Sequence, residues 1–167
     1  ATNGVVHGVD AVIDLPTVVT FAVADPTFDS LQAALTTDGQ PDFVATLSSE
    51  GPFTVFAPTN DAFTALLDSN MMWNDLTDID TALLTSVLQH HVVTPANVRS
   101  GDLVDGISPE TLEGDTITIN LPGTGDNIAD VTDGSGATDI GIIAVDVQAA
   151  NGVIHALNKV MVPDTTN

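Results

Sequence analysis

The sequence predicts an α+β domain in which a wedge of β-strands (a sandwich) carries a cluster of short helices packed on one side. Two observations predict this class. In the first half of the chain apolar residues recur at helical spacing, whereas from Gly106 onward they alternate with polar residues or form short runs between Gly-rich turns. With 167 residues, 43% of them hydrophobic, the chain can bury one core. A helix-rich half followed by a strand-rich half is typical of α+β proteins.

The helix signals lie before Gly106. Phe28, Leu31 and Leu35 follow the i, i+3, i+7 spacing of one helix face. Further helices are expected at 17–25 and 43–47, in the segment that carries Phe63, Leu66 and Leu67, and in the segment that carries Leu83, Leu84, Val87 and Leu88. Thr59, Asn60 and Asp61 are good N-cap residue types, so we expect them to begin the helix of Phe63.

The strand signals are β-prone runs bounded by turn residues. Strands are expected at 53–57, 116–120, 128–131, 140–147 and 153–162, with a short extended segment at 90–93. Gly152 follows Asn151, and this pair predicts a tight turn in which the glycine supplies a positive φ.

The charge of the chain excludes several classes of partner. Two Lys and Arg residues stand against 23 Asp and Glu, for a formal net charge of -21. Recognition of phosphate needs Lys and Arg, so we expect neither nucleic acid nor anionic lipid headgroups as partners. No apolar stretch is long enough to span a bilayer, so no membrane insertion of this domain is expected. So acidic a surface suits a saline setting or a halophilic organism.

An internal echo predicts that the chain includes the end of a second copy of the domain. Residues 1–12 (ATNGVVHGVDAV) and 149–160 (AANGVIHALNKV) align at a constant offset of 148, with six of the twelve positions identical. This spacing is that of a domain rather than of a solenoid repeat. We therefore expect residues 1–14 to be the tail strand or linker of an upstream copy, residues 15–165 to be the domain itself, and the chain to come from a tandem array.

Three blocks of sequence resemble the fasciclin (FAS1) domain family. Residues 53–63 (FTVFAPTNDAF) resemble its first signature block, and residues 151–155 (NGVIH), running on to Val162-Pro163, resemble its second. Residues 88–93 (LQHHVV) resemble the central Tyr-His segment of the family, with His90 in place of the usual Tyr and His91 in the His place. The blocks occur in the family's order and cover about residues 15–163.

The resemblance implies a non-enzymatic adhesion or matrix-interaction module that is secreted or anchored at the cell surface. It implies as partners a cell-surface or matrix protein or glycan, together with neighbouring FAS1 domains. It also points to candidate adhesion and signature positions, which are His91, Val92, Asp146, Val147, Asn151 and His155. An alternative reading is a carrier of a small hydrophobic ligand, because some fasciclin-like proteins bind pigments or lipids.

Catalytic and metal-binding patterns are weak in this sequence. The chain has no Cys, no Gly-x-Ser-x-Gly and no phosphate loop, so no enzyme and no cofactor is expected. His90 and His91 would project to opposite sides of an extended segment, which favours structural roles over shared metal ligation. Calcium is the one ion considered, with Asp126, Asp130, Asp133 and Asp139 as candidate ligands. Their spacing is not that of an EF-hand, and a solvated acidic hairpin loop explains them as well.

Overall fold

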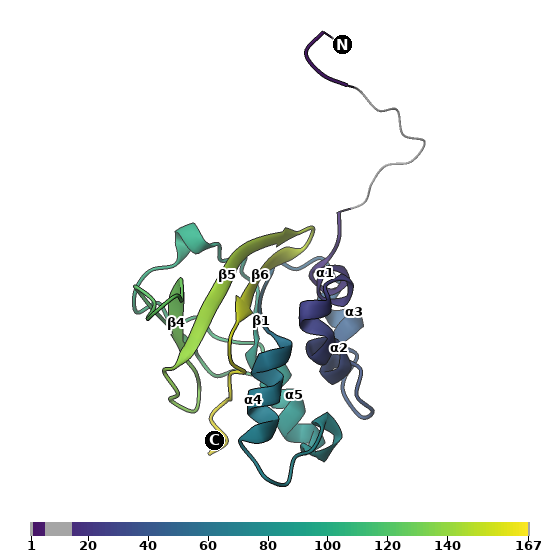
Figure 1. Ribbon diagram of the computed structural model, residues 1–167, viewed down its shortest axis with the longest axis vertical. Helices are drawn as coiled ribbons and strands as arrows, with labels where there is room; N and C mark the ends of the chain where they lie inside the picture. Colours follow the sequence, from purple (N-terminus) through teal and green to yellow (C-terminus); the bar gives the residue numbers. More distant parts are fainter. Residues whose placement is uncertain (1, 6–14, 167) are drawn as a thin grey trace.

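One mixed, curled sheet organises the domain in the computed structural model, which describes residues 2–5 and 15–166 (Figure 1). Its strands are β1 (Phe53–Pro58), β2 (Val92–Val93), β3 (Thr118–Asn120), β4 (Ala129–Thr132), β5 (Ile140–Ala149) and β6 (Gly152–Leu157). They lie in the order β2-β1-β6-β5-β4-β3. β1 and β6 are parallel and the other neighbours are antiparallel. The parallel pair places the two signature blocks side by side, with Phe56 opposite His155.

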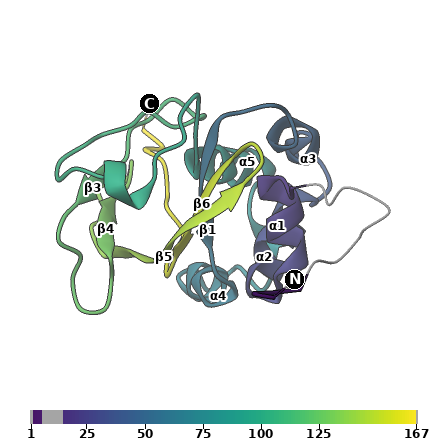
Figure 2. The ribbon, with the colours of Figure 1, turned by 90° about the horizontal axis from the view of Figure 1, so that it is seen from above.

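The helices gather beside β1 and β6, whereas β3 and β4 lie at the far side of the sheet (Figures 1 and 2). The α-helices are α1 (Val18–Ala24), α2 (Asp29–Leu35), α3 (Phe43–Leu47), α4 (Asn60–Asp68) and α5 (Thr81–His90). The short 3-10 helices are η1 (Pro26–Phe28), η2 (Leu76–Asp78) and η3 (Ser100–Asp102). This arrangement confirms the predicted α+β class and the cluster of helices on one side.

The core divides into two apolar clusters, one on each side of the β1–β6 pair. The first packs the helices against the sheet and includes Leu31, Phe63 and Leu84. The second lies inside the curled strands, where Ile119 and Ile142 are fully buried. Successive side chains of a strand point to opposite faces of the sheet, so residues of the parallel strands β1 and β6 belong to both clusters. Val55 belongs to the first and Phe56 to the second.

The helix boundaries follow capping chemistry that the sequence displays. Thr17 accepts a hydrogen bond from Thr20 N at the start of α1, and Asp80 accepts from the first turn of α5. Thr59 caps α4 through Ala62 N, as predicted. Each of these caps satisfies backbone N–H groups that have no partner within the helix. All five predicted helical segments contain an α-helix.

Three expectations of local structure are wrong. His90 is the last residue of α5 and His91 caps that helix, so the pair does not lie in an extended segment. β6 ends at Leu157 rather than at Val162, and farther along the chain Met161 N and Val162 N donate to the side chains of His91 and Asp133 instead of to a strand. Gly152 does not have a positive φ. A Cβ at this position would lie 2.2 Å from Phe53 O, so the glycine is required by close contact between β1 and β6.

Candidate functional site

His91 is an internal bridge rather than an exposed contact residue. It is 3% exposed at the end of α5. Its Nδ1 donates a hydrogen bond to Val87 O over 2.6 Å, and its Nε2 accepts one from Met161 N over 2.9 Å. Both ring nitrogens are therefore occupied when the ring is neutral. Burial lowers the pKa of His91 from 6.5 to about 4, so it stays neutral at neutral pH. Val92, the next candidate, is buried in β2.

Asn151 ties three segments together at the turn between β5 and β6. Its Oδ1 accepts a hydrogen bond from Val18 N over 3.0 Å. Its Nδ2 donates to Leu47 O over 2.7 Å and to Ser49 O over 2.8 Å. The side chain thus joins the start of α1 and the end of α3 to the sheet.

His155 is fully buried in β6 and stacks on Phe56, with 5.5 Å between the ring centroids. Its Nε2 donates a hydrogen bond to Val98 O over 2.8 Å, whereas Nδ1 has no hydrogen-bond partner among the described residues. Burial lowers the pKa of His155, so the ring is neutral. The signature histidine therefore anchors the segment before η3 to the sheet.

Asp146 and Val147 lie at an irregularity in β5, and both are half-buried. Asp146 has a φ of 61°, a conformation that is uncommon for a residue other than glycine. Its carboxylate accepts hydrogen bonds from Ser100 N, over 2.7 Å, and from Ser100 Oγ. These bonds hold the pKa of Asp146 below its usual range. The carboxylate thus fixes the start of η3, and Val147 packs beside the first core cluster.

The four aspartates considered for calcium are not brought together. Asp130 and Asp133 are buried, and their carboxylates accept hydrogen bonds from the surrounding backbone, Asp130 from Thr124 N and Asp133 from Ala137 N. Asp139 forms an ion pair with Lys159, and Asp126 is exposed. Two of these residues therefore organise loops, which differs from the solvated hairpin that the sequence suggested.

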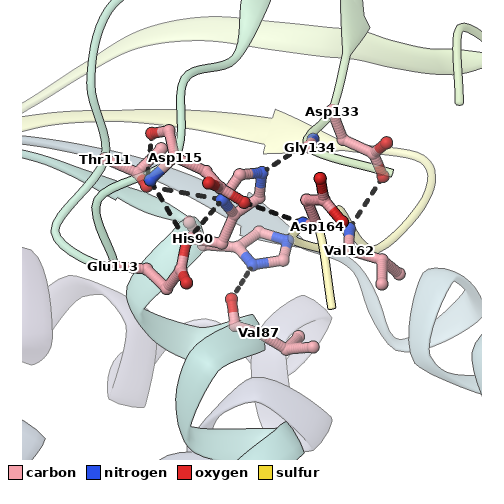
Figure 3. A network of polar contacts seen from close by, with 10 residues as sticks. Val87, His90, Thr111, Glu113, Asp115, Asp133, Gly134, Val162 and Asp164 are labelled. Carbon is pink, nitrogen blue, oxygen red and sulfur yellow. Dashed lines mark hydrogen bonds and ion pairs between the residues drawn. The ribbon is translucent and has the colours of Figure 1, made fainter. Parts of the chain in front are cut away.

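The polar cluster that sequence reasoning missed surrounds His90 (Figure 3). His90 is fully buried, and its Nδ1 lies 3.3 Å from Thr111 Oγ1 and 3.6 Å from Glu113 Oε2. Asp115 completes the group. These residues come from α5 and from a loop that pairs with β2 through the bridge between Val93 and Thr111. The only sequence signal is the alternation Thr-x-Glu-x-Asp at 111–115, which has no period that would link it to His90.

This cluster has the residue types of a metal site, because His90 Nδ1 and carboxylate oxygens of Glu113 and Asp115 lie within 4.8 Å of one another. The hydrogen bonds oppose that use. Gly134 N donates to His90 Nε2 over 3.1 Å, so Nε2 must be unprotonated and Nδ1 must carry the hydrogen. A metal at Nδ1 would need that hydrogen removed and an acceptor beside Nε2, as ligating histidines usually have. The donor set therefore fits a hydrogen-bonded network and not a metal ion.

The network holds the C-terminal strap, which we define as residues 161–164 (Figure 3). Met161 N donates to His91 Nε2, and Val162 N donates to Asp133 Oδ2 over 2.8 Å. Asp164 N donates to Asp115 Oδ2 over 2.7 Å. Side chains thus replace the strand pairing that ends with β6, and they fix where the chain leaves the domain.

The apolar cavity that the helices cover is small. An apolar cavity between α1, α2 and the sheet has a volume of about 20 Å³ and is lined by residues that include Leu31, Leu88 and His91. That is room for about one water molecule, whereas sites for drug-sized ligands usually have about 300 Å³ or more. The cavity cannot hold a pigment or a lipid in this conformation.

The fold and the internal roles of the signature residues define a small α+β module that a buried polar framework stabilises. The fasciclin domain model matches residues 26–163, and the chain therefore belongs to the fasciclin domain family. A solved structure of a FAS1 domain pair from the insect cell adhesion molecule Fasciclin I has the same fold, with a TM-score of 0.59 and 19% identity over 82% of this chain and 46% of that one.

Relatives with this domain differ widely in length. Protein sll1483 of Synechocystis sp. is 36% identical over 88% of this chain and 73% of its own length. Human periostin is 33% identical over 99% of this chain but only 18% of its own length, and the porcine transforming growth factor-beta-induced protein ig-h3 is 32% identical over 99% of this chain and 22% of its own. Among the residues that the structure describes, no helix is long and apolar enough to cross a membrane.

Proposed function

We propose that this domain is an extracellular adhesion or matrix-interaction module, secreted or anchored at a cell surface, which contacts a protein or glycan there and catalyses no reaction. Its membership of the fasciclin family and its likeness in fold to an insect cell adhesion molecule support this proposal. The strongly acidic surface keeps separate copies apart and soluble, which suits a module that is exposed to solvent.

One observation carries the proposal: the polar signature residues form hydrogen bonds inside the domain. His91 and Asn151 have every polar side-chain group bonded to backbone, and His155 is fully buried. A catalytic histidine needs a nitrogen that can reach a substrate, which neither buried imidazole offers in this conformation. These signature residues therefore stabilise the fold, and a partner must bind the exposed surface instead. The small cavity gives no support to the alternative of a pigment or lipid carrier.

We also propose that the domain is one unit of a tandem array. The echo between residues 1–12 and 149–160 supports this organisation, and the Fasciclin I structure contains a pair of such domains. Only residues 2–5 of the segment assigned to the upstream copy, 1–14, are described, and these four residues are exposed. Tandem copies would multiply weak contacts, because binding by one copy raises the effective concentration of the next.

Adhesion is tested with the chain coated on beads. Folded protein should retain at least one of collagen, fibronectin, cellulose and mannan in 0.15 M NaCl, as measured by flow cytometry with labelled ligands. The matched control is the same chain unfolded by heat before coating, which keeps the composition and charge of the chain but loses its folded surface. Equal retention of all four ligands by the folded chain and the unfolded control would refute an adhesion surface specific to the fold.

A further inference from the structure

All the sulfur of this chain is in methionine. The sequence has three Met and no Cys, so neither a thiol nor a disulfide can respond to an oxidant. The three methionines lie in opposite environments, because Met71 is fully exposed and Met72 is 78% exposed, whereas Met161 is fully buried. Susceptibility to oxidation follows access to solvent. The fold therefore separates two reactive sulfur atoms from one that is protected.

The two exposed methionines lie on an ordered turn between α4 and η2. Met72 N donates a hydrogen bond to Asn70 Oδ1 over 3.0 Å, and Trp73 N donates to Asn70 O over 2.9 Å. Trp73 is partly buried and packs against the first core cluster. Beyond it, Asn74 N donates to Asp78 Oδ2 over 2.7 Å. The backbone is thus held on both sides of the turn, while the methionine side chains are open to solvent.

The turn lies away from the sheet and from both core clusters. In Figure 1 the chain loops out at the lower end of α4, at the end of the domain opposite the turn between β5 and β6. Met161, in contrast, belongs to the second core cluster. A sulfoxide at Met161 would place a polar group in the core, which is costly, whereas a sulfoxide at Met71 or Met72 would remain in water.

The charge of the chain selects the kind of oxidant that reaches the turn. The formal net charge is -21, and Asp68 and Asp75, which flank the turn, are both exposed. A negative potential lowers the local concentration of anions but does not act on a neutral molecule. Hydrogen peroxide is neutral at neutral pH, so it reaches both thioethers without repulsion.

We propose that Met71 and Met72 form a peroxide-reactive modification site, at which oxidation converts the turn from apolar to polar while the fold persists. In each reaction the thioether sulfur attacks one oxygen of hydrogen peroxide and the O–O bond breaks. The transferred oxygen gives up its hydrogen to the departing hydroxide, which leaves as water. The sulfur is oxidised to a sulfoxide and the peroxide is reduced. Methionine sulfoxide reductases reverse the change, so the site is reversible.

The modification changes the surface that is open to a partner. Among the large apolar side chains that are exposed in the described part of the chain, Met71 and Met72 alone are adjacent in sequence. A partner that contacts this turn would lose an apolar contact on oxidation. The inference goes beyond the proposed adhesion, because both the reaction and its effect on polarity are measured without a partner.

Peptide mass spectrometry after treatment with hydrogen peroxide tests the site in the folded chain. Met71 and Met72 should each gain one oxygen. Met161 should react at least about a hundredfold more slowly, because a buried side chain reacts only in open states, which have a population of about 10⁻³ or less in a stable domain. In concentrated urea the three methionines should react at similar rates. Comparable rates for Met161 and Met72 in the folded chain would overturn the inference.

Retention on a phenyl column measures the change in polarity. Peroxide should weaken the retention of the native chain, leave its urea midpoint unchanged, and be reversed by methionine sulfoxide reductases A and B. The Met71→Leu/Met72→Leu variant is the matched control, because leucine keeps the turn apolar but has no sulfur, and its retention should not respond to peroxide. An equal loss of retention in this variant, a lower urea midpoint after oxidation, or a loss that the reductases do not restore would each refute the assignment.

Discussion

Replacement of Asn151 by alanine tests whether the signature maintains the fold. The side chain holds three backbone groups, namely Val18 N, Leu47 O and Ser49 O. Alanine removes all three hydrogen bonds without enlarging the side chain. The start of α1 and the end of α3 would then lose their link to the turn between β5 and β6.

The magnitude follows from the burial of the groups left behind. Val18 and Leu47 are 2% and 4% exposed, so Val18 N and Leu47 O have no direct access to water, whereas Ser49 is exposed and its carbonyl can be hydrated. A buried polar group without a partner costs about 1–3 kcal/mol, so two such groups predict a loss of about 3 kcal/mol. That is a large part of the 5–15 kcal/mol typical of a whole domain. It corresponds to a fall of about 6–12 °C in the melting temperature.

Urea unfolding followed by circular dichroism measures this loss as a lower midpoint with an unchanged slope. Asn70→Ala is the matched control, because Asn70 caps only the exposed Met72 N. Asn151→Asp should be at least as damaging as alanine, since it directs a carboxylate at two carbonyl oxygens. A midpoint for Asn151→Ala equal to that of Asn70→Ala would refute the assigned structural role.

Three further predictions concern pH, the N-terminus and metals. Because the pKa of His91 falls from 6.5 to about 4 on folding, the stability that its neutral form contributes should be fully present above pH 6.5 and decline as the pH approaches 4, by up to about 3 kcal/mol. Burial also lowers the pKa of His90 and His155, which acts in the same direction. A urea midpoint that does not change between pH 7 and pH 4.5 would contradict this prediction. Deletion of residues 1–12 should leave the free energy of unfolding unchanged, since the first described bond to the domain is at Pro16, and a large loss would assign that segment to this domain. Zinc and calcium should produce no binding heat in calorimetry and no rise in melting temperature; a rise that His90→Asn abolishes would show that the His90 cluster does bind metal.

The fold was largely predictable because its determinants are local. Apolar spacing located the helices, and a cap such as Thr59 lies next in sequence to the helix that it begins. The blocks that resemble the fasciclin family supplied the class and were confirmed by the family match. The errors arose where the conformation of a residue depends on a contact with a residue that is distant in sequence. Gly152 is needed because Phe53 O lies against it, and the side chains of His91 and Asp133, not a neighbouring strand, bind the backbone N–H groups of the strap beyond β6.

The polar framework could not be predicted in the same way. His90, Glu113 and Gly134 lie far apart in sequence and meet only after the sheet has curled. The acidic composition also concealed which aspartates are special, because exposed Asp126 and buried Asp133 are the same residue type in neighbouring loop segments. Sequence composition counts charges but does not say which backbone N–H groups they will face.

The sequence alone determines the helical and strand segments, the acidic character and the similarity between residues 1–12 and 149–160. These properties depend on side-chain chemistry and spacing along the chain. Only the tertiary structure decided that His91, Asn151 and His155 serve the interior, and that the chain leaves through a strap clamped by side chains. The physical reason is that a hydrogen bond depends on the position of both partners, and the fold alone brings together partners that are distant in sequence.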